Sequence, residues 1–161
     1  MRFAVDGMLG KLTRWLRMLG HDVEYSTKVD DAELITKAKA EGRVLLTRDF
    51  ELYKRAVGRD IEAFYVEGST EEERLAEITK RFKIRLEIDM ETSRCPKCNT
   101  RMIPVPKKKI KSSVQTSTFA NYEEFWQCPN CGQIYWRGAH WKKIGKTLEK
   151  AKRILEAKQE E

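Results

Sequence analysis

Long hydrophobic runs are missing from this sequence of 161 residues. Its apolar stretches are only a few residues long, whereas a helix that crosses a bilayer needs about 20, so we expect no membrane-spanning segment. The first residues, MRFAVDGMLGKL, contain neither a hydrophobic leader nor a small-residue cleavage site, and we therefore expect no export by a signal peptide. These absences predict a cytoplasmic protein with no membrane partner.

Cysteine is scarce, and its four copies lie in two Cys-x-x-Cys pairs, Cys95 with Cys98 and Cys128 with Cys131. In a chain that is not exported, such pairs indicate metal binding rather than disulfides. Each pair forms a tight turn whose sulfurs fit one edge of a tetrahedron, so two pairs complete a closed zinc site. A closed site leaves no position for substrate, and the zinc is predicted to be structural. Thiol redox chemistry is the competing interpretation, but two matched pairs with proline in the same place argue against it.

Charged side chains are plentiful, at 35% of the sequence, but they are unevenly spread. Residues 1–90 carry 17 basic and 18 acidic side chains, whereas residues 91–161 carry 15 basic and 7 acidic ones. A nearly neutral half joined to a basic half indicates that one part does chemistry while the other holds a polyanion. The alternative is a solvated, lysine-rich surface without a specific partner.

Strand-like and helix-like segments alternate through the first half of the chain. The expected strands are 2–6, 22–25, 43–47 and 61–66, and the expected helices are 8–19, 30–41, a short segment containing Leu52 to Ala56, and 70–82. This alternation predicts an α/β unit with a mostly parallel sheet flanked by helices. Right-handed crossovers favour an order in which the first strand lies between the second and the third. Residues 84–88 form either one more strand or the approach to a linker.

The pattern changes at about residue 91, where the cysteine pairs, a lysine run and several tryptophans replace the alternation. We therefore divide the chain into an α/β domain at 1–90, a small zinc ribbon at 91–144 and a polar C-terminal helix at 145–161. The insert between the cysteine pairs, 99–127, is longer than a minimal ribbon needs, so we expect a hairpin or a flexible loop there.

Three aspartates are predicted to meet at one edge of the sheet. Asp6 ends the first strand, Asp49 follows the third, and Asp31 opens the helix after the second. Ligands of parallel sheets bind beyond the carboxyl ends of such strands. Gathered carboxylates repel one another but suit a hard cation such as Mg²⁺ or Mn²⁺, which supports phosphodiester hydrolysis. Glu51 is a candidate additional acid. The alternative for each aspartate is a turn or a helix cap.

Basic residues near both predicted metal sites are candidate contacts to nucleic acid. Lys11, Arg14 and Arg17 follow Asp6 at spacings of three on the first helix, away from its leucine stripe. In the ribbon insert the candidates are Lys107, Lys108 and Lys109, which are followed by several aromatic residues. Phosphates on basic side chains and bases on aromatic rings are typical of single-stranded RNA binding. The alternatives are a solvated helix face for the first group and a ribbon core for the aromatics.

Four stretches carry a family resemblance when they occur in one chain: FAVDGMLGKLTRWLRMLGHDVEY, DDAELITKA, EGRVLLTRD, and CPKC followed by CPNCGQIYWRGAHW. With these stretches the sequence resembles the PIN-like RNase family that is named for the C-terminal domain of a mutator exonuclease. The resemblance extends to about residue 145. The combination is specific, whereas the TRD element alone recurs in several related groups.

The resemblance implies a PIN-like fold, metal-dependent cleavage of RNA by an acidic cluster, and an accessory zinc ribbon. By position, Asp6 corresponds to the acid of the first strand, Asp31 to the acid that opens the second helix, and Asp49 to the acid of the TRD element. Glu51 stands where related groups often have a second acid, and Glu67 is a candidate for a fourth.

The sequence therefore predicts a ribonuclease that uses Mg²⁺ or Mn²⁺ for catalysis and Zn²⁺ for structure, with RNA gripped by the ribbon. One alternative is a non-catalytic RNA-binding protein associated with the ribosome or ribosomal RNA. The other is an adaptor whose ribbon and last helix bind another protein.

Overall fold

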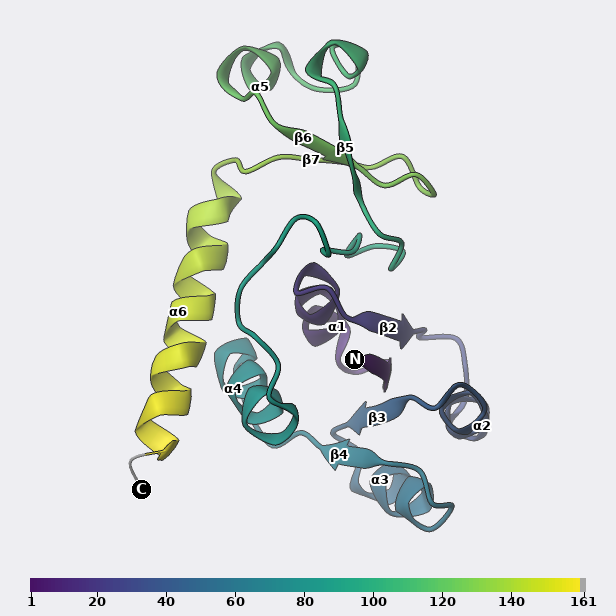
Figure 1. The fold of residues 1–161 in the computed structure, drawn as a ribbon. Coiled ribbons are helices and arrows are strands. Elements are labelled where there is room, and N and C mark those ends of the chain that lie inside the picture. Colours follow the sequence, from purple (N-terminus) through teal and green to yellow (C-terminus); the bar gives the residue numbers. More distant parts are fainter. Residues whose placement is uncertain (160–161) are drawn as a thin grey trace.

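A computed structural model of the chain describes residues 1–159, and Figure 1 shows four parallel strands at the centre of its first half. These strands are β1 (Arg2–Val5), β2 (Asp22–Tyr25), β3 (Val44–Thr47) and β4 (Ala63–Tyr65). They pair in the order β2-β1-β3-β4. The structure thus confirms the predicted α/β class and the predicted place of the first strand between the second and third.

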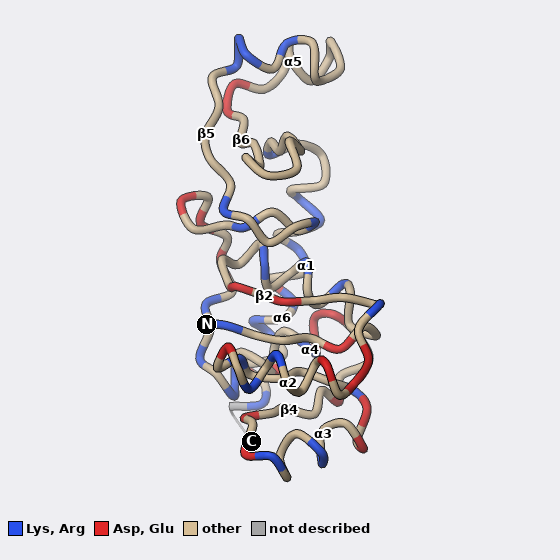
Figure 2. The backbone as a smooth tube through the Cα atoms, turned by 90° about the vertical axis from the view of Figure 1, so that its right-hand side faces the viewer, with Lys and Arg blue, Asp and Glu red and all other residues tan. Residues whose placement is uncertain are grey.

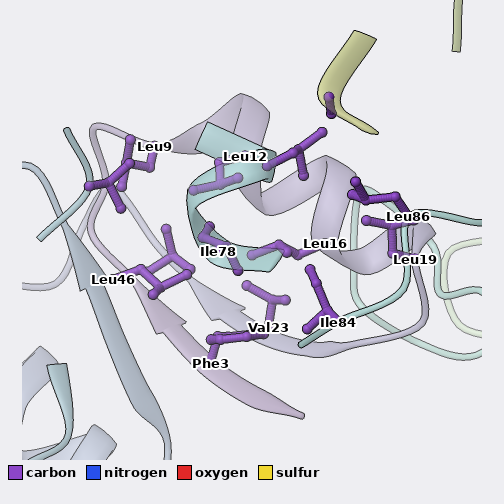
Figure 3. Close-up of a cluster of buried hydrophobic side chains, with 14 of the residues drawn as sticks. Phe3, Leu9, Leu12, Leu16, Leu19, Val23, Leu46, Ile78, Ile84 and Leu86 are labelled. Atoms are coloured by element: carbon purple, nitrogen blue, oxygen red, sulfur yellow. The ribbon is translucent and has the colours of Figure 1, made fainter. Parts of the chain in front are cut away.

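Helices cover both faces of this sheet. They are α1 (Gly10–Met18), α2 (Asp31–Glu41), α3 (Phe50–Val57) and α4 (Glu71–Phe82). Because side chains alternate along a strand, Phe3 and Leu46 pack on one face with α1 and α4, as Figure 3 shows. Ala4 and Leu45 pack on the other face with α2 and α3. We call β1–β4 with α1–α4 the sheet unit.

Capping residues in the sequence set the helix ends. Thr70 accepts a hydrogen bond from the backbone of Glu73, whose carboxylate accepts one in return from the backbone of Thr70, so α4 begins with the predicted capping box. Asp30 caps α2 by accepting from Glu33 N over 2.8 Å. Gly42 ends α2 at a φ of +63°, a conformation that glycine adopts without strain.

Beyond the sheet unit the chain builds a second, antiparallel sheet. Residues 84–88 form no strand, although Ile84 and Leu86 are buried against the first core. The second sheet contains β5 (Ile103–Val105), β6 (Phe125–Gln127) and β7 (Ile134–Tyr135). The insert between β5 and β6 holds a 3₁₀ turn at Lys107–Lys109 and the short helix α5 (Thr116–Asn121). We call this sheet, its insert and the four cysteines the ribbon.

The last helix, α6 (His140–Gln159), returns from the ribbon and packs along α4. The helix begins at His140 rather than at residue 145, where the sequence analysis placed its start. Residues 160 and 161, which were also expected in the helix, lie outside the described part of the chain. Leu148 and Ala151 of this helix are buried in the core that α1 and α4 share. No helix within residues 1–159 is both long and apolar enough to cross a membrane.

Buried polar contacts fix the ribbon against α1 and the edge strand β2. Arg17 is only 7% exposed, and its guanidinium donates to the carbonyl oxygens of Val23 and Pro96. Asn99 Oδ1 accepts from Val23 N over 3.0 Å, while Asn99 Nδ2 donates to Asp22 Oδ1 over 2.8 Å. Arg17, which was expected on a basic row facing nucleic acid, is therefore a structural residue that joins the two parts.

Candidate active site and metal centre

Asp6 and Asp49 are connected through Thr47 at the carboxyl edge, by which we mean the edge of the sheet where β1 and β3 end. Thr47 Oγ1 donates to Asp6 Oδ2 over 2.8 Å and accepts from the backbone N–H of Asp49 over 2.9 Å. The Thr47 side chain is fully buried, so its two hydrogen bonds fix its hydroxyl. The threonine therefore positions the carboxylate of Asp6 beside the turn that carries Asp49.

Each of these two aspartates has one bonded and one open carboxylate oxygen. Asp49 Oδ1 caps α3 by accepting from Glu51 N over 3.0 Å and from Leu52 N over 3.2 Å. Within residues 1–159, neither Asp6 Oδ1 nor Asp49 Oδ2 accepts a hydrogen bond. Both residues are partly exposed. The capping role and a role as ligand are therefore compatible, because they use different oxygens.

Asp31 lies at the start of α2, but it points to a different partner. Its Oδ2 is 3.8 Å from Nη1 of Arg55 on α3, and both side chains are 46% exposed. An ion pair this exposed contributes little stability. Among residues 1–159, the four cysteines are the one group of three or more potential ligands whose atoms lie within 4.8 Å of one another. The structure thus links Asp6 to Asp49, but Asp31 does not join them in such a group.

The two glutamates named from the sequence are exposed. Glu51 forms an ion pair with Lys54 over 3.0 Å, and its side chain is 78% exposed. Glu67 is exposed at the end of β4, where its backbone N–H donates to Glu77 Oε1. For neither glutamate does the structure show a contact that marks it as a metal ligand.

Glu71, the first residue of α4, is an acid that the sequence analysis missed. Its Oε1 accepts from Arg74 Nη1 over 2.9 Å, whereas its Oε2 is buried without a hydrogen-bond partner. Burial raises the pKa of Glu71 above its usual value, although the positive charges of Arg74 and Lys11 oppose the shift. Because the charge of Lys11 acts on the Glu71 carboxylate, Glu71 lies near the start of α1. The capping box at Thr70 is the signal that could have placed this acid at the carboxyl edge.

The basic residues named from the sequence are mostly unpaired. Lys11 and Arg14 are exposed on α1, and neither forms an ion pair within residues 1–159. In the ribbon, Lys107 pairs with Glu123 over 2.8 Å, while Lys108 and Lys109 are exposed with no such pair among the described residues. Figure 2 shows that Asp and Glu gather mainly in the sheet unit, so these lysines lie in the less acidic part.

The four cysteines converge to one group. Cys95 Sγ lies 3.7 Å from Cys131 Sγ, and Cys98 Sγ lies 3.2 Å from Cys128 Sγ. A tetrahedral zinc ion with four thiolates separates its sulfurs by about 3.8 Å, so the arrangement fits a metal ion such as zinc. The Tyr135 hydroxyl, 3.1 Å from Cys95 Sγ, adds a polar contact around the group.

Comparison with known proteins gives one match. The family model described as the Mut7-C RNAse domain matches residues 1–148, which include the sheet unit, the ribbon and the first part of α6. A search of the curated proteins and a search of the solved structures found no match.

Proposed function

The chain belongs to the Mut7-C RNAse domain family, and from this premise we propose that it is a metal-dependent ribonuclease acting at the carboxyl edge of its sheet. Family membership indicates ribonuclease activity and RNA as the substrate. The observation that carries the proposal is the Asp6–Thr47–Asp49 connection, which leaves one open oxygen on each carboxylate. Partly exposed carboxylates arranged in this way suit a cation that enters from solvent together with a phosphate.

Under this proposal, Asp6 and Asp49 hold Mg²⁺ or Mn²⁺ through their open oxygens, and Asp31 completes the acidic set. The residues fit because Mg²⁺ in proteins uses one or two carboxylates and keeps several waters, without a full cage of side chains. When bound, such an ion supplies activation of water and neutralisation of charge on the scissile phosphate. Glu71 replaces Glu67 as our candidate for a fourth acid.

The other residues of the site act on the carboxylates and on RNA. Thr47 orients Asp6 by donating to one of its oxygens. Lys11 and Arg14 bind phosphates of the strand that is cut, since both are exposed, cationic and carried by the helix that begins just after Asp6.

We also propose that zinc binds to the four cysteines and that different parts of the chain have different roles. Residues 1–90 perform the hydrolysis, residues 91–144 grip RNA, and the C-terminal helix joins them. The lysines of the 3₁₀ turn, Lys107 to Lys109, bind phosphates without sequence preference. Zinc is structural here, because all four positions of its shell are filled by the protein.

The decisive experiment compares Asp6→Asn with the unchanged protein on single-stranded RNA in Mn²⁺. Loss of one metal-binding carboxylate is expected to lower the cleavage rate by about 100-fold or more while RNA affinity stays similar. Asp60→Asn is the matched control, because Asp60 is an exposed turn residue with a φ of +59° that asparagine tolerates. Equal, Mn²⁺-dependent cleavage by the Asp6→Asn protein would remove Asp6 from the mechanism.

One observation favours the non-catalytic alternative, an RNA-binding protein without turnover. Asp31 is turned toward Arg55 and not toward the other two aspartates. Titration of RNA with and without Mn²⁺ separates the alternatives, because binding without product at any metal concentration supports the non-catalytic protein.

A further inference from the structure

A cavity of about 770 Å³ lies between the sheet unit and the ribbon, and no residue of the carboxyl edge lines it. Its wall is formed by α1, the segment that follows residue 87, the ribbon strands and the start of α6, whose backbones can be located in Figure 1. Ligand pockets in proteins measure about 300–1,000 Å³. The cavity is therefore large enough for a nucleotide.

Aromatic side chains dominate the wall on the ribbon side. Those that line it include Tyr122, Trp126, Trp136 and Trp141. The guanidinium of Arg137 lies 5.1 Å from the ring centroid of Trp126 and 5.7 Å from that of Trp141. Trp136 and Trp141 are only partly buried, so their rings remain open to a planar ligand. Flat apolar surfaces beside a cation are what an unstacked base needs, because bases stack on aromatic rings and on guanidinium planes.

The charged groups of the cavity favour a ligand that carries negative charge. Ser93 lines the cavity, but its Oγ is buried and has no surface open to a ligand there. Arg14 and Arg137 both line the cavity and are exposed. Among residues 1–159, no Asp or Glu lines it. Arg14 forms no ion pair among the described residues, whereas Arg137 is 3.5 Å from Glu124 in an exposed ion pair that a phosphate can replace.

Helix α1 connects this cavity with the carboxyl edge. The helix begins four residues after Asp6, and Arg14 lies about 6 Å along its axis from Gly10. Lys11 faces the acidic end near Glu71, and Arg14 faces the cavity. One strand of RNA can therefore contact both places through successive phosphates on the same helix.

We propose that the cavity binds an unstacked base of single-stranded RNA, with the base against the aromatic side chains and an adjoining phosphate on Arg14 and Arg137. The inference rests on the proposed ribonuclease function and adds the subsite that holds the substrate next to the acids.

The test measures the affinity of the full-length, zinc-loaded protein for a short fluorescent single-stranded RNA without added Mg²⁺ or Mn²⁺, so that binding is separated from cleavage. Trp141→Ala is expected to raise the dissociation constant about 5- to 100-fold, the range that loss of one stacked base gives. Trp141→Phe should restore most of the affinity. Tyr53→Ala, an aromatic truncation on α3 at the far end of the molecule, is the matched control and should leave the affinity unchanged.

A second measurement does not depend on how the variants fold. RNA that carries bases should quench the tryptophan fluorescence of the unchanged protein, whereas an abasic RNA of equal length should bind at least fivefold more weakly and quench little. Equal affinity for the two RNAs, or full affinity of a zinc-loaded Trp141→Ala protein, overturns the proposal and leaves the cavity to a different kind of ligand. Failure of the unchanged protein to cleave RNA in Mn²⁺ contradicts the proposed function instead, and the binding comparison still stands.

Discussion

At the scale of single residues, the best-defined feature of the candidate site is a buried hydroxyl. Thr47 has one hydrogen to donate and gives it to Asp6, and it accepts from the backbone of Asp49. The sequence places Thr47 at the end of an apolar strand, where it either finishes the strand or supports a ligand. The structure shows that Thr47 ends β3 and that its position in the strand brings its hydroxyl between the two acids.

Thr47→Val tests this role with a side chain of nearly the same shape. Loss of the hydroxyl leaves the Asp49 N–H without its partner and lets Asp6 rotate, so we expect about a tenfold loss of cleavage rate, the effect of removing a group that orients a metal ligand. The free energy of unfolding should fall by about 1–3 kcal/mol. Rates in Mn²⁺ and urea unfolding check both effects. Thr47→Ser keeps the hydroxyl, and a loss as large as that of Thr47→Val would contradict the positioning role.

A second prediction at this scale concerns pH. Burial, together with the positive charges of the N-terminal ammonium, 3.0 Å from Nδ1, and of Arg94, lowers the pKa of His21 to about 4. Between about pH 4 and pH 6.5 the unfolded chain then binds a proton that the folded protein does not, so the free energy of unfolding should fall as pH drops through this window. Urea unfolding at several pH values measures the slope.

His21→Gln removes the titrating group and should flatten that slope. His140→Gln is the matched control, because His140 is exposed and should leave the pH profile as it is. An unchanged slope in the His21→Gln protein would contradict the assignment of this acid sensitivity to His21. Asp22 acts at lower pH, because its stabilising effect is lost only as the pH falls below about 4. Burial opposes ionisation of Asp22, but hydrogen bonds from Arg43 and Asn99 outweigh it and lower the pKa of Asp22 to about 2.

At the scale of helices and strands, local patterns in the sequence predict much of the sheet unit. The helix caps at Asp30 and Thr70 and the buried run before Asp49 locate two helices and a central strand, because each depends on neighbours in the sequence. Local patterns do not predict ion pairs and buried polar contacts between distant segments. Asp31 with Arg55, and Arg17 with Pro96, join residues far apart in the chain, and no local pattern encodes which partner wins.

Asn99 is the contact between elements whose loss we expect to cost most. It closes the open edge of β2 by accepting from Val23 N, and its φ is +73°. Asn99→Ala removes both hydrogen bonds and adds left-handed strain, so the free energy of unfolding should fall by about 2–4 kcal/mol. Asn99→Gly keeps the conformation and should cost less, which urea unfolding can measure. A cost no larger than that of Asn130→Ala, at an exposed turn, would contradict the docking role.

At the scale of the whole molecule, we expect the ribbon to depend on a metal ion held by its four cysteines. Its two apolar clusters are small, and one of them is centred on Cys95 and Cys128 themselves. Such a cluster cannot offset the entropy of ordering the ribbon without help. The sequence predicts this dependence from the cysteine spacing alone, but it does not reveal the cavity, whose wall is assembled from α1, the ribbon and α6.

Removal of zinc should therefore unfold the ribbon and leave the sheet unit folded. Structural zinc supplies about 10–16 kcal/mol of apparent free energy, and the buried Trp126 reports its loss through a red shift in fluorescence. RNA affinity should fall with the same dependence on chelator, while most of the circular dichroism of the sheet unit remains. Retention of full RNA affinity by the metal-free protein would show that the ribbon does not grip RNA.

The return of α6 along α4 has a geometric consequence. The chain enters the ribbon from the sheet unit and leaves it through α6, which packs against the same unit. The ribbon is therefore attached to the sheet unit at both of its ends. If the ribbon binds RNA as proposed, attachment at both ends restricts its movement relative to the sheet unit, so the distance between the bound base and the acids varies little. Under the proposed function, cleavage would then occur at a fixed distance from the bound nucleotide. The products should be RNA fragments of regular size.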